Sequence, residues 1–352
     1  MTVSSILILN CFRSTHFAVL NPMNFNKYHQ QDISSAKFLV TGGAGFIGSN
    51  LVAYLVQYQA AKIVVLDNLS TGYLENIAEF INNGQVQFIE GDIRDYKTCT
   101  EAMQGIDFVL HEAALGSVPR SINDPITTNE VNISGFLNIL QAAKEAGVKR
   151  MVYAASSSTY GDSPSLPKQE AIIGNPLSPY AVTKYVNELY ADVFSRTYQF
   201  HSIGLRYFNV FGPKQNVNGP YAAVIPLFIT QILNGERPVI NGDGLTSRDF
   251  TFVSNVVQAN IKALLADNLV KHEVFNVACN EQTSLTQLVS AITENLGSSL
   301  EPVYKPERKG DVKHSLADIS KAGNQLHYQP EVLFKDGLKE TINYFQELIG
   351  AS

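Results

Sequence analysis

Three side chains in the middle of the chain could together transfer a proton and assist hydride chemistry. Tyr180 and Lys184 stand in the run S-P-Y-A-V-T-K, and residues four apart on a helix share one face. A nearby ammonium favours the phenolate, as would a positively charged nicotinamide, so we expect the pKa of Tyr180 to be lowered. Such a phenolate can take a hydroxyl proton as hydride leaves the same carbon. Ser156, which follows the apolar run 151–155, is placed to bridge the substrate hydroxyl and the phenolate.

The spacing Y-x-x-x-K is common by chance and would alone be typical of an exposed pair. Its interpretation depends on a nucleotide-binding turn earlier in the chain. Gly42, Gly45 and Gly48 follow the β-prone run 38–40 as G-x-x-G-x-x-G, and 46–56 is predicted to be a helix. Glycines let the backbone approach a pyrophosphate, and the helix N-terminus offers free N–H groups to it. The residues expected to face the cofactor here are Gly42, Gly45, Phe46, Ile47 and Gly48.

Asp67 decides which dinucleotide the turn would bind. It ends a second apolar run, 63–66, about 20 residues past the glycines, where a ribose-binding acid is expected. A carboxylate there accepts hydrogen bonds from both adenosine ribose hydroxyls and repels a 2′-phosphate. The sequence therefore predicts NAD and not NADP. The alternative is an ordinary strand–turn–helix unit in which Asp67 caps a strand.

Further apolar runs alternate with helical segments, which is typical of a parallel sheet with crossover helices. Strands are expected at 86–89, 108–111, 151–155 and 202–206, and one helix over 126–146. We predict an α/β fold, a Rossmann-type doubly wound parallel sheet with a smaller C-terminal substrate-binding α/β lobe. The carboxyl ends of such strands face the ligand crevice. This rule adds the cofactor candidates Asn68, Asp92, Ile93, Ala113 and Ala114.

Three regions are expected along the chain. Residues 1–36 read as an N-terminal extension, which could be disordered or could reflect a misassigned start. Residues 37–210 are predicted to form the NAD-binding domain. From Phe211 onward the rhythm loosens around Pro213, Pro220 and Pro226, so 211–352 is predicted to form a substrate-binding lobe interleaved with late Rossmann elements.

Composition indicates a globular enzyme, with 45% hydrophobic and 16% charged residues over 352 positions. A net charge of −6 argues against nucleic acid or an anionic membrane as partner. No apolar run approaches the roughly 18 residues that a membrane helix needs. Cys11, Cys99 and Cys279 stand far apart without metal-ligand spacing, which suits a reducing compartment and predicts no metal site. We expect a cytoplasmic protein.

The motifs place the chain in a known family. It resembles the extended short-chain dehydrogenases/reductases, more closely the UDP-hexose 4-epimerases, and among these the UDP-N-acetylglucosamine 4-epimerases of bacterial surface-polysaccharide pathways. The resemblance runs from about Lys37 to the last helices. Its motifs are T-G-G-A-G-F-I-G, D-N-L-S-T-G, H-E-A-A-L-G-S-V-P-R-S, A-A-S-S-S-T-Y-G, S-P-Y-A-V-T-K, L-R-Y-F-N-V-F-G, N-G-D-G-L-T-S-R-D-F and R-K-G-D-V-K-H-S.

The resemblance implies roles for individual residues. It makes Tyr180 the base, gives Lys184 the nicotinamide ribose as well, and makes Ser156 the proton relay. It places Tyr207 by the nicotinamide carboxamide and Asn209, Arg248 and Arg308 on the substrate diphosphate. The arginines could instead be surface ion pairs with Asp249 and Asp311, and Asn209 could be a turn residue. The remaining substrate-binding candidates are Gly116, Ser117, Ser157, Ser158, Ala223, Val224, Val239, Asn241, Asp311 and Ser315.

The residues after Ser156 separate reactions within the superfamily. Sugar-nucleotide 4,6-dehydratases resemble this chain but carry an Asp-Glu pair where Ser157 and Ser158 stand here, and related decarboxylases keep a Glu. Water elimination needs an acid and a base beside the 4-keto sugar, and two serines are neither at neutral pH. An oxidised sugar could then only be reduced again. A dehydratase, a decarboxylase and a non-catalytic NAD-binding module remain the alternatives.

Substrate size depends on Ser315. Related epimerases confined to glucose and galactose resemble this stretch but carry a tyrosine, whereas a serine leaves room for an N-acetyl group. The resemblance therefore implies reversible C4 epimerisation of UDP-GlcNAc and UDP-GalNAc through a 4-keto sugar. Activity mainly on UDP-Glc/UDP-Gal or on UDP-hexuronic acids is the alternative, and Ser315 could be a plain loop residue. It further implies a homodimer formed through 126–146 and 180–198.

Overall fold

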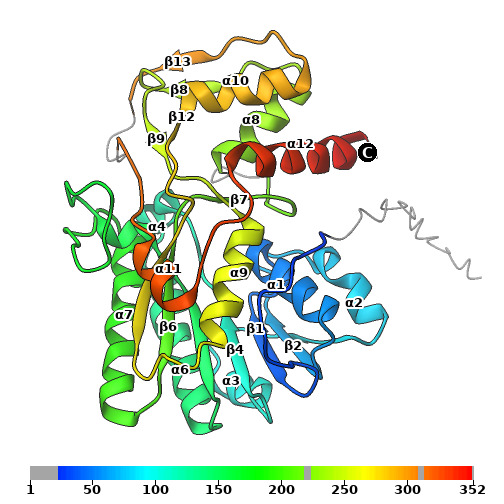
Figure 1. Cartoon of the computed structure of the whole chain (residues 1–352), viewed down its shortest axis with the longest axis vertical. Coiled ribbons are helices and arrows are strands. Elements are labelled where there is room, and N and C mark those ends of the chain that lie inside the picture. Colours follow the sequence, from blue (N-terminus) through cyan, green and yellow to red (C-terminus); the bar gives the residue numbers. More distant parts are fainter. Residues whose placement is uncertain (1–22, 218–222, 308–312, 351–352) are drawn as a thin grey trace, which may run out of the picture.

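A seven-stranded sheet forms the centre of the molecule (Figure 1). The computed structural model describes residues 23–217, 223–307 and 313–350. All neighbouring strands are parallel, in the order β11-β6-β5-β4-β1-β2-β3. Their near-continuous apolar runs suit strands that are buried on both faces. The strands are β1 (Lys37–Thr41), β2 (Lys62–Asp67), β3 (Val86–Glu90), β4 (Phe108–His111), β5 (Arg150–Ser156), β6 (Ser202–Tyr207) and β11 (Glu273–Val277).

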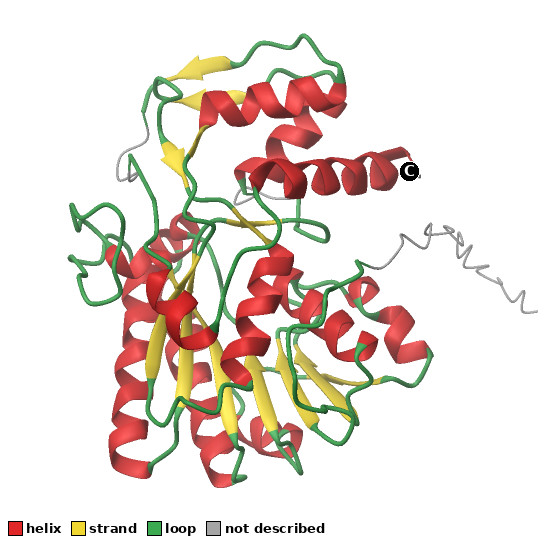
Figure 2. Cartoon of the chain, in the orientation of Figure 1, coloured by secondary structure: helices red, strands yellow, loops and turns green. Residues whose placement is uncertain are grey.

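Helices cover both faces of this sheet, as Figure 2 shows. One core cluster lies between the sheet and α1 (Phe46–Gln57), α9 (Val253–Leu264) and α11 (Ser320–Leu326). The second lies between the opposite face and α3 (Tyr96–Ala102), α6 (Phe136–Glu145) and α7 (Pro179–Tyr198). The predicted doubly wound fold is confirmed. The short helices η1 (Leu74–Asn76), α2 (Ala78–Asn82), α4 (Val118–Asn123) and η3 (Ser157–Tyr160) connect these elements.

The single helix expected over 126–146 is interrupted. Its first turn is α5 (Pro125–Asn129), a π-helical turn η2 follows (Glu130–Gly135), and α6 completes it. Within this turn the Asn132 side chain accepts a hydrogen bond from Leu115 N at 2.8 Å and donates to Leu115 O at 3.0 Å. π-Turns occur where a helix must turn a side chain toward a neighbouring segment. Here that segment is the loop after β4.

A smaller lobe stands above the carboxyl ends of the strands (Figure 1). Its core joins three helices to Phe211, Ile240, Phe250 and Phe252. The helices are α8 (Val224–Leu233), α10 (Leu285–Leu296) and α12 (Phe334–Gly350). Three two-stranded pairs complete it: β7 (Val210–Phe211) with β10 (Thr251–Phe252), β8 (Val239–Asn241) with β13 (Val303–Lys305), and β9 (Ser247–Arg248) with β12 (Thr283–Ser284). Since α9, β11 and α11 return to the sheet, this part of the chain is shared between lobe and sheet.

Residues 23–36, which precede β1, are packed on the core, so the disorder considered for the extension over 1–36 does not apply to this part of it. Phe25, Tyr28 and Ile33 are buried in the cluster around α1 and α9. Phe25 N donates to Gln57 Oε1 at 3.0 Å, and the Tyr28 ring stacks on Tyr54 at a centroid distance of 5.4 Å. Because most residues of this segment are polar, its composition gave no indication that these three side chains are buried. Residues 1–22 lie outside the described part of the chain. Within the described part, no helix is long and apolar enough to cross a membrane.

Candidate active site

A cleft of about 480 Å³ opens at the carboxyl ends of the strands, beneath the smaller lobe. It brings together residues from β2, β5 and β6 and from the loops after β1 and β4 with the N-terminal parts of α1 and α7. Most of the predicted site residues line it: Gly42, Gly45, Phe46, Ile47, Gly48, Asp67, Asn68, Asp92, Ile93, Ala113, Ala114, Gly116, Ser156, Ser157, Tyr180, Lys184, Tyr207 and Asn209. The cleft therefore joins the glycine turn to the proposed proton-transfer residues.

The glycine turn has the shape that a diphosphate needs. Gly42 has φ +68°, and a Cβ there would lie 2.7 Å from Ala113 N. A Cβ on Gly48 would lie 2.1 Å from Gly42 O. Any side chain at either position would separate β1 from β4 or α1 from the turn. The cradle is thus closed to side chains and open to a ligand at the N-terminus of α1.

Asp67 lies at the end of β2 with its carboxylate tied to the turn. Its oxygens accept hydrogen bonds from Ala44 N at 3.0 Å and Leu69 N at 2.8 Å. The pKa of Asp67 is raised, because the effect of burial is larger than the opposing effect of these two hydrogen bonds. Asp92, at the end of the next strand, accepts from Asn68 Nδ2 at 2.9 Å and pairs with Arg94 at 2.7 Å. These hydrogen bonds hold the pKa of Asp92 at about 2, so a fixed negative charge stands beside Asp67.

Ser156, Tyr180 and Lys184 converge on the opposite side of the cleft. Ser156 is the last residue of β5, and its side chain hydrogen-bonds Tyr180. α7 begins one residue before Tyr180, where the Ser178 hydroxyl caps it by accepting from Ala181 N. Lys184 Nζ donates to Ala154 O at 2.8 Å and lies 6.0 Å from the Tyr180 ring centroid. The i,i+4 arrangement inferred from spacing therefore exists and faces the cleft.

The pKa of Tyr180 is raised, so the expected lowering is wrong. Burial is the main cause, and the Glu112 carboxylate adds to it, whereas the Ser156 hydrogen bond acts in the opposite direction. Lys184 is not among the groups that shift the pKa of Tyr180; its ammonium donates to the Ala154 carbonyl, and burial lowers its own pKa to about 8. A cation placed in the cleft would have to supply the missing stabilisation of the phenolate.

The loop after β4 is fixed to the helix that carries Tyr180 and Lys184. Asn132 Nδ2, which already holds Leu115, also lies 3.1 Å from Thr183 Oγ1 on α7. Ser117, in the same loop, has φ +89° and caps α4 through Arg120 N. Positive φ at a non-glycine residue is strained and is found most often near functional sites. Gly116 lines the cleft, whereas Ser117 does not.

The expected substrate residues of the smaller lobe lie outside this cleft but are linked to it. Asn209 lines the cleft, and its Nδ2 donates to Asp249 O at 3.3 Å. Arg248 lies between Asp249 and Ser247 in the chain, and Ser315 N donates to the Ser247 carbonyl at 3.1 Å. Hydrogen bonds to the two backbone neighbours of Arg248 therefore link Asn209 and Ser315 to the same short segment. Arg308 and Asp311 fall outside the described residues.

Other substrate candidates are positioned less directly. Ser158 does not line the cleft, and its hydroxyl donates to Ser156 Oγ at 2.9 Å. Val239 and Asn241 belong to β8, paired with β13, while Ala223 caps α8 and Val224 begins it. None of these four lines the cleft.

Several residues that line the cleft were not predicted. Glu112 stands within a motif that was noted but not assigned, and Lys214 follows β7 in a loop with Asn216. Lys214 Nζ donates to Asn76 O at 2.9 Å, and Asn216 Nδ2 donates to Tyr73 Oη at 2.8 Å. The rule that ligands lie at the carboxyl ends of strands could have found Glu112. The contacts of Lys214 and Asn216 join segments that are far apart in the chain, so no local sequence pattern predicts them.

The residues of the cleft fit a dinucleotide. The glycine cradle excludes a Cβ, Asp67 stands where the adenosine ribose would end, and Lys184 and Tyr207 lie at the far end. The described part of the chain contains no group of three His, Cys, Asp or Glu side chains that could hold a metal ion. His111, which ends β4, bonds Thr41 Oγ1 at 2.7 Å, and burial lowers its pKa to about 3.

Comparison with known proteins identifies relatives over nearly the whole chain. Residues 38–278 match the model of the NAD dependent epimerase/dehydratase family. A putative UDP-glucose 4-epimerase of Methanocaldococcus jannaschii is 37% identical over 88% of this chain and 98% of its own. The solved UDP-N-acetylglucosamine 4-epimerase of Methanobrevibacter ruminantium, in complex with UDP-N-acetylmuramic acid, is 40% identical with a TM-score of 0.85, covering 89% of this chain and 99% of its own.

A third relative was solved with its cofactor. The UDP-glucuronic acid 4-epimerase of Bacillus cereus, in complex with UDP-glucuronic acid and NAD, is 32% identical with a TM-score of 0.82. The alignment covers 89% of this chain and 99% of that one. These proteins share one reaction at C4 of a UDP-sugar but differ in the sugar.

Proposed function

Because the chain belongs to the NAD dependent epimerase/dehydratase family, we propose that it interconverts UDP-GlcNAc and UDP-GalNAc at C4. It is an NAD-dependent UDP-sugar 4-epimerase, and we propose that its substrates are the N-acetylated pair. The main support for the reaction is a single cleft that joins the glycine turn to Ser156, Tyr180 and Lys184. Surface-polysaccharide synthesis is the pathway class that the resemblance suggests.

Each residue of the trio has a distinct task in this reaction. The glycine turn and Asp67 would hold NAD, which would supply the acceptor and the donor of the C4 hydride. Tyr180 takes the proton of the C4 hydroxyl, and Ser156, hydrogen-bonded to it, bridges the two oxygens. Lys184 holds its ammonium beneath the phenol and is positioned to hold the nicotinamide ribose. Inversion requires the 4-keto sugar to turn about its diphosphate, which Asn209, Arg248 and Arg308 are proposed to anchor.

The neighbours of Ser156 favour epimerisation over elimination. Ser157 lines the cleft, and Ser158 donates its hydroxyl to Ser156. Neither can act as a general acid or base at neutral pH, as loss of water from a keto sugar would require. We therefore expect the same sugar skeleton in substrate and product. A 4-keto-6-deoxy sugar in the product mixture would contradict this proposal.

A direct comparison of substrates tests the finer proposal. UDP-GlcNAc, UDP-Glc and UDP-glucuronic acid would be supplied separately, and the products formed during the initial, linear phase would be separated by chromatography. We expect turnover of the N-acetylated substrate to be fastest. Faster turnover of UDP-Glc or UDP-glucuronic acid would retain the 4-epimerase and overturn the substrate preference.

Ser315→Tyr tests the residue to which the preference is assigned. Ser315 is half-buried and is held next to Arg248 through Ser247. A phenol ring would fill space that an N-acetyl group needs, and overpacking costs about 1–3 kcal/mol. Turnover of UDP-GlcNAc should fall at least about tenfold, while UDP-Glc is spared. Equal loss on both substrates, or no loss, would mean that Ser315 is a loop residue without a part in selection.

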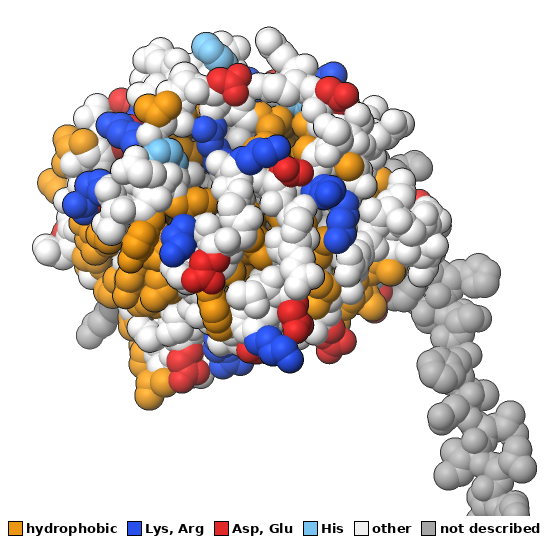
Figure 3. Space-filling model, turned by 90° about the horizontal axis from the view of Figure 1, so that it is seen from below, with side chains coloured by type: hydrophobic (Ala, Val, Ile, Leu, Met, Phe, Trp, Pro, Cys, Tyr) orange, Lys and Arg blue, Asp and Glu red, His pale blue; other side chains and the backbone are white. Residues whose placement is uncertain are grey.

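We also propose that the protein is a homodimer formed through residues 126–146, which span most of α5, η2 and α6, and through α7. Hydrophobic side chains gather toward the left of the face in Figure 3, the side on which α7 lies in Figure 1. Val182, Leu189 and Val193 are 43–49% exposed along α7, and Ile126 on α5 is 72% exposed. Residues 182, 189 and 193 share one face of the helix. A contiguous apolar face of this kind is typical of a subunit interface.

A further inference from the structure

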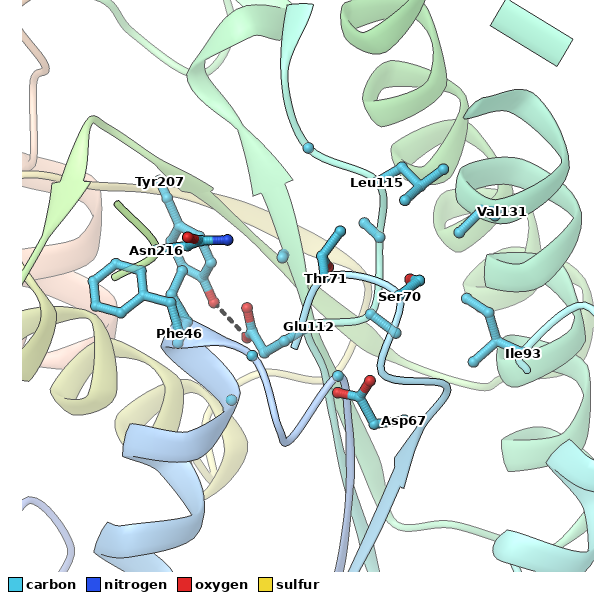
Figure 4. Close-up of a pocket in the computed structure, with 18 of the residues that line it drawn as sticks. Phe46, Asp67, Ser70, Thr71, Ile93, Glu112, Leu115, Val131, Tyr207 and Asn216 are labelled. Atoms are coloured by element: carbon cyan, nitrogen blue, oxygen red, sulfur yellow. Dashed lines mark hydrogen bonds between the residues drawn. The ribbon is translucent and has the colours of Figure 1, made fainter. Parts of the chain in front are cut away.

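Glu112 is a charged residue of the cleft that the mechanism above does not use. It follows β4, and its side chain reaches across to β6, where Tyr207 Oη donates to Glu112 Oε1 at 2.8 Å (Figure 4). Asn260 Nδ2 from α9 donates to the same Tyr207 oxygen at 2.8 Å. This chain of two hydrogen bonds fixes the carboxylate at the wall of the cleft.

The position of Glu112 differs from that of the other cleft carboxylates. Among the described residues that line the cleft, Asp67 and Asp92 also carry carboxylates, and both are engaged near the ends of β2 and β3. Asp67 binds two backbone N–H groups, and Asp92 is paired with Arg94. Within residues 23–217, 223–307 and 313–350, no cation pairs with Glu112 at bonding distance, and the positive charge that acts on it is that of Lys184. The Glu112 carboxylate in turn raises the pKa of Tyr180, so its electrostatic effect reaches the reactive end of the cleft.

Burial raises the pKa of Glu112 to about 7, while the Tyr207 hydrogen bond and Lys184 oppose this rise. At mildly alkaline pH the carboxylate is therefore ionised, with few water molecules to screen it. A negative charge in such a site interacts strongly with a positive one a few ångströms away. The groups that face it are Lys184 and Tyr180 from α7 and Tyr207 from β6.

We propose that Glu112 is a positioning residue whose carboxylate stabilises the oxidised, positively charged nicotinamide relative to the reduced, neutral one. This rests on the proposed function, which puts the nicotinamide between Lys184 and Tyr207. Hydride transfer from C4 to the ring removes the positive charge of the ring, and return of the hydride restores it. Glu112 then favours return, so that the 4-keto sugar is reduced before it can leave.

The reduction potential of the bound cofactor tests this without any sugar. Holoenzyme would be titrated spectroscopically at mildly alkaline pH with dithionite and redox mediators. Glu112→Gln retains an oxygen that can accept from Tyr207 Oη but removes the charge. We expect the preference for the oxidised form to fall at least about tenfold, which is a potential about 30 mV more positive for a two-electron couple. Asp107→Asn is the matched control, because it removes a carboxylate at the opposite end of β4, outside the cleft, and should leave the potential unchanged.

Glu112→Asp separates charge from hydrogen bonding and serves if Glu112→Gln does not fold. The shorter side chain keeps the charge but withdraws from Tyr207. We expect its potential to stay within about threefold of the wild type, which is about 15 mV. An unchanged potential in Glu112→Gln, an equal shift in Asp107→Asn, or a tenfold shift in Glu112→Asp would overturn the proposal. Failure of the wild type to epimerise a UDP-sugar would instead overturn the proposed function, since the titration contains no sugar.

Discussion

At the scale of single residues, the ionisation of Tyr180 limits what the site can do. Burial and Glu112 raise its pKa, and Ser156 is the described neighbour whose hydrogen bond lowers it. Ser156 and a cation bound in the cleft are therefore the groups that favour the phenolate. The contribution of Ser156 can be removed by substitution.

Tyr180→Phe removes the proton acceptor and keeps the ring. We expect the fold and the bound NAD to persist and turnover to fall at least about a hundredfold, in the range of general-base contributions. The measurement is the initial rate of UDP-GlcNAc conversion beside the NAD content of the purified protein. Tyr185→Phe is the matched control, because Tyr185 is on the same helix and does not line the cleft. A near-normal rate for Tyr180→Phe would show that another group takes the proton.

Ser156→Ala tests the lowering of the phenol pKa. The hydrogen bond from Ser156 favours the phenolate, so its loss raises the pKa of Tyr180 and leaves less phenolate at a given pH. The acid limb of the pH–rate profile should therefore move to higher pH. Activity should fall by about tenfold or more at neutral pH and partly recover at alkaline pH. A uniform fall at every pH would indicate that Ser156 orients the substrate without changing the ionisation of Tyr180.

At the scale of elements, the glycine turn is the part of the cleft that has the least space for added side-chain atoms. Gly42→Ala would put a Cβ 2.7 Å from Ala113 N at a positive φ, so β4 would have to move away from β1. We expect loss of most bound NAD, measured as nucleotide released on denaturation. Gly84→Ala is the matched control: its φ is +72°, and no atom lies within 4 Å of the added Cβ. That variant should lose about 1 kcal/mol of stability and retain its cofactor.

The strands show what could be predicted from sequence. β1, β2, β4 and β5 are continuous apolar runs, and their positions were predicted within about two residues because burial on both faces leaves a local pattern. β11 has the sequence Glu-Val-Phe-Asn-Val, half polar, and its place beside β6 follows a long excursion through the smaller lobe. The π-turn was missed because its cause, Asn132 holding Leu115 and Thr183, is tertiary.

The same division holds for the site. Tyr180 and Lys184 were found because i,i+4 spacing fixes a shared face, and Ser156 because a strand end fixes its location. Lys214 became visible only when strands from different parts of the chain met, whereas the position of Glu112 directly after β4 could have indicated it. The raised pKa of Tyr180 likewise depends on burial, which spacing does not encode.

At the scale of the whole molecule, the two layers of helices leave α7 with one face toward the sheet and one outward. The inner face buries Ala191 and Phe194 in the core, and the outer face exposes Val182, Leu189 and Val193. The catalytic pair belongs to the same helix as this outer face. A partner that covers the outer face would hold α7 firmly and thereby hold Tyr180 and Lys184 in place.

Leu189→Glu tests the proposed dimer. A carboxylate buried without a partner in an apolar interface is strongly unfavourable, so the two subunits should separate. We expect light scattering during gel filtration to give twice the chain mass for the wild type and the chain mass for the variant. Val270→Glu is the matched control, because Val270 is 74% exposed in the loop between α9 and β11 and should not change the mass. A wild type of single-chain mass, or a variant that keeps the double mass, would exclude a dimer through this face.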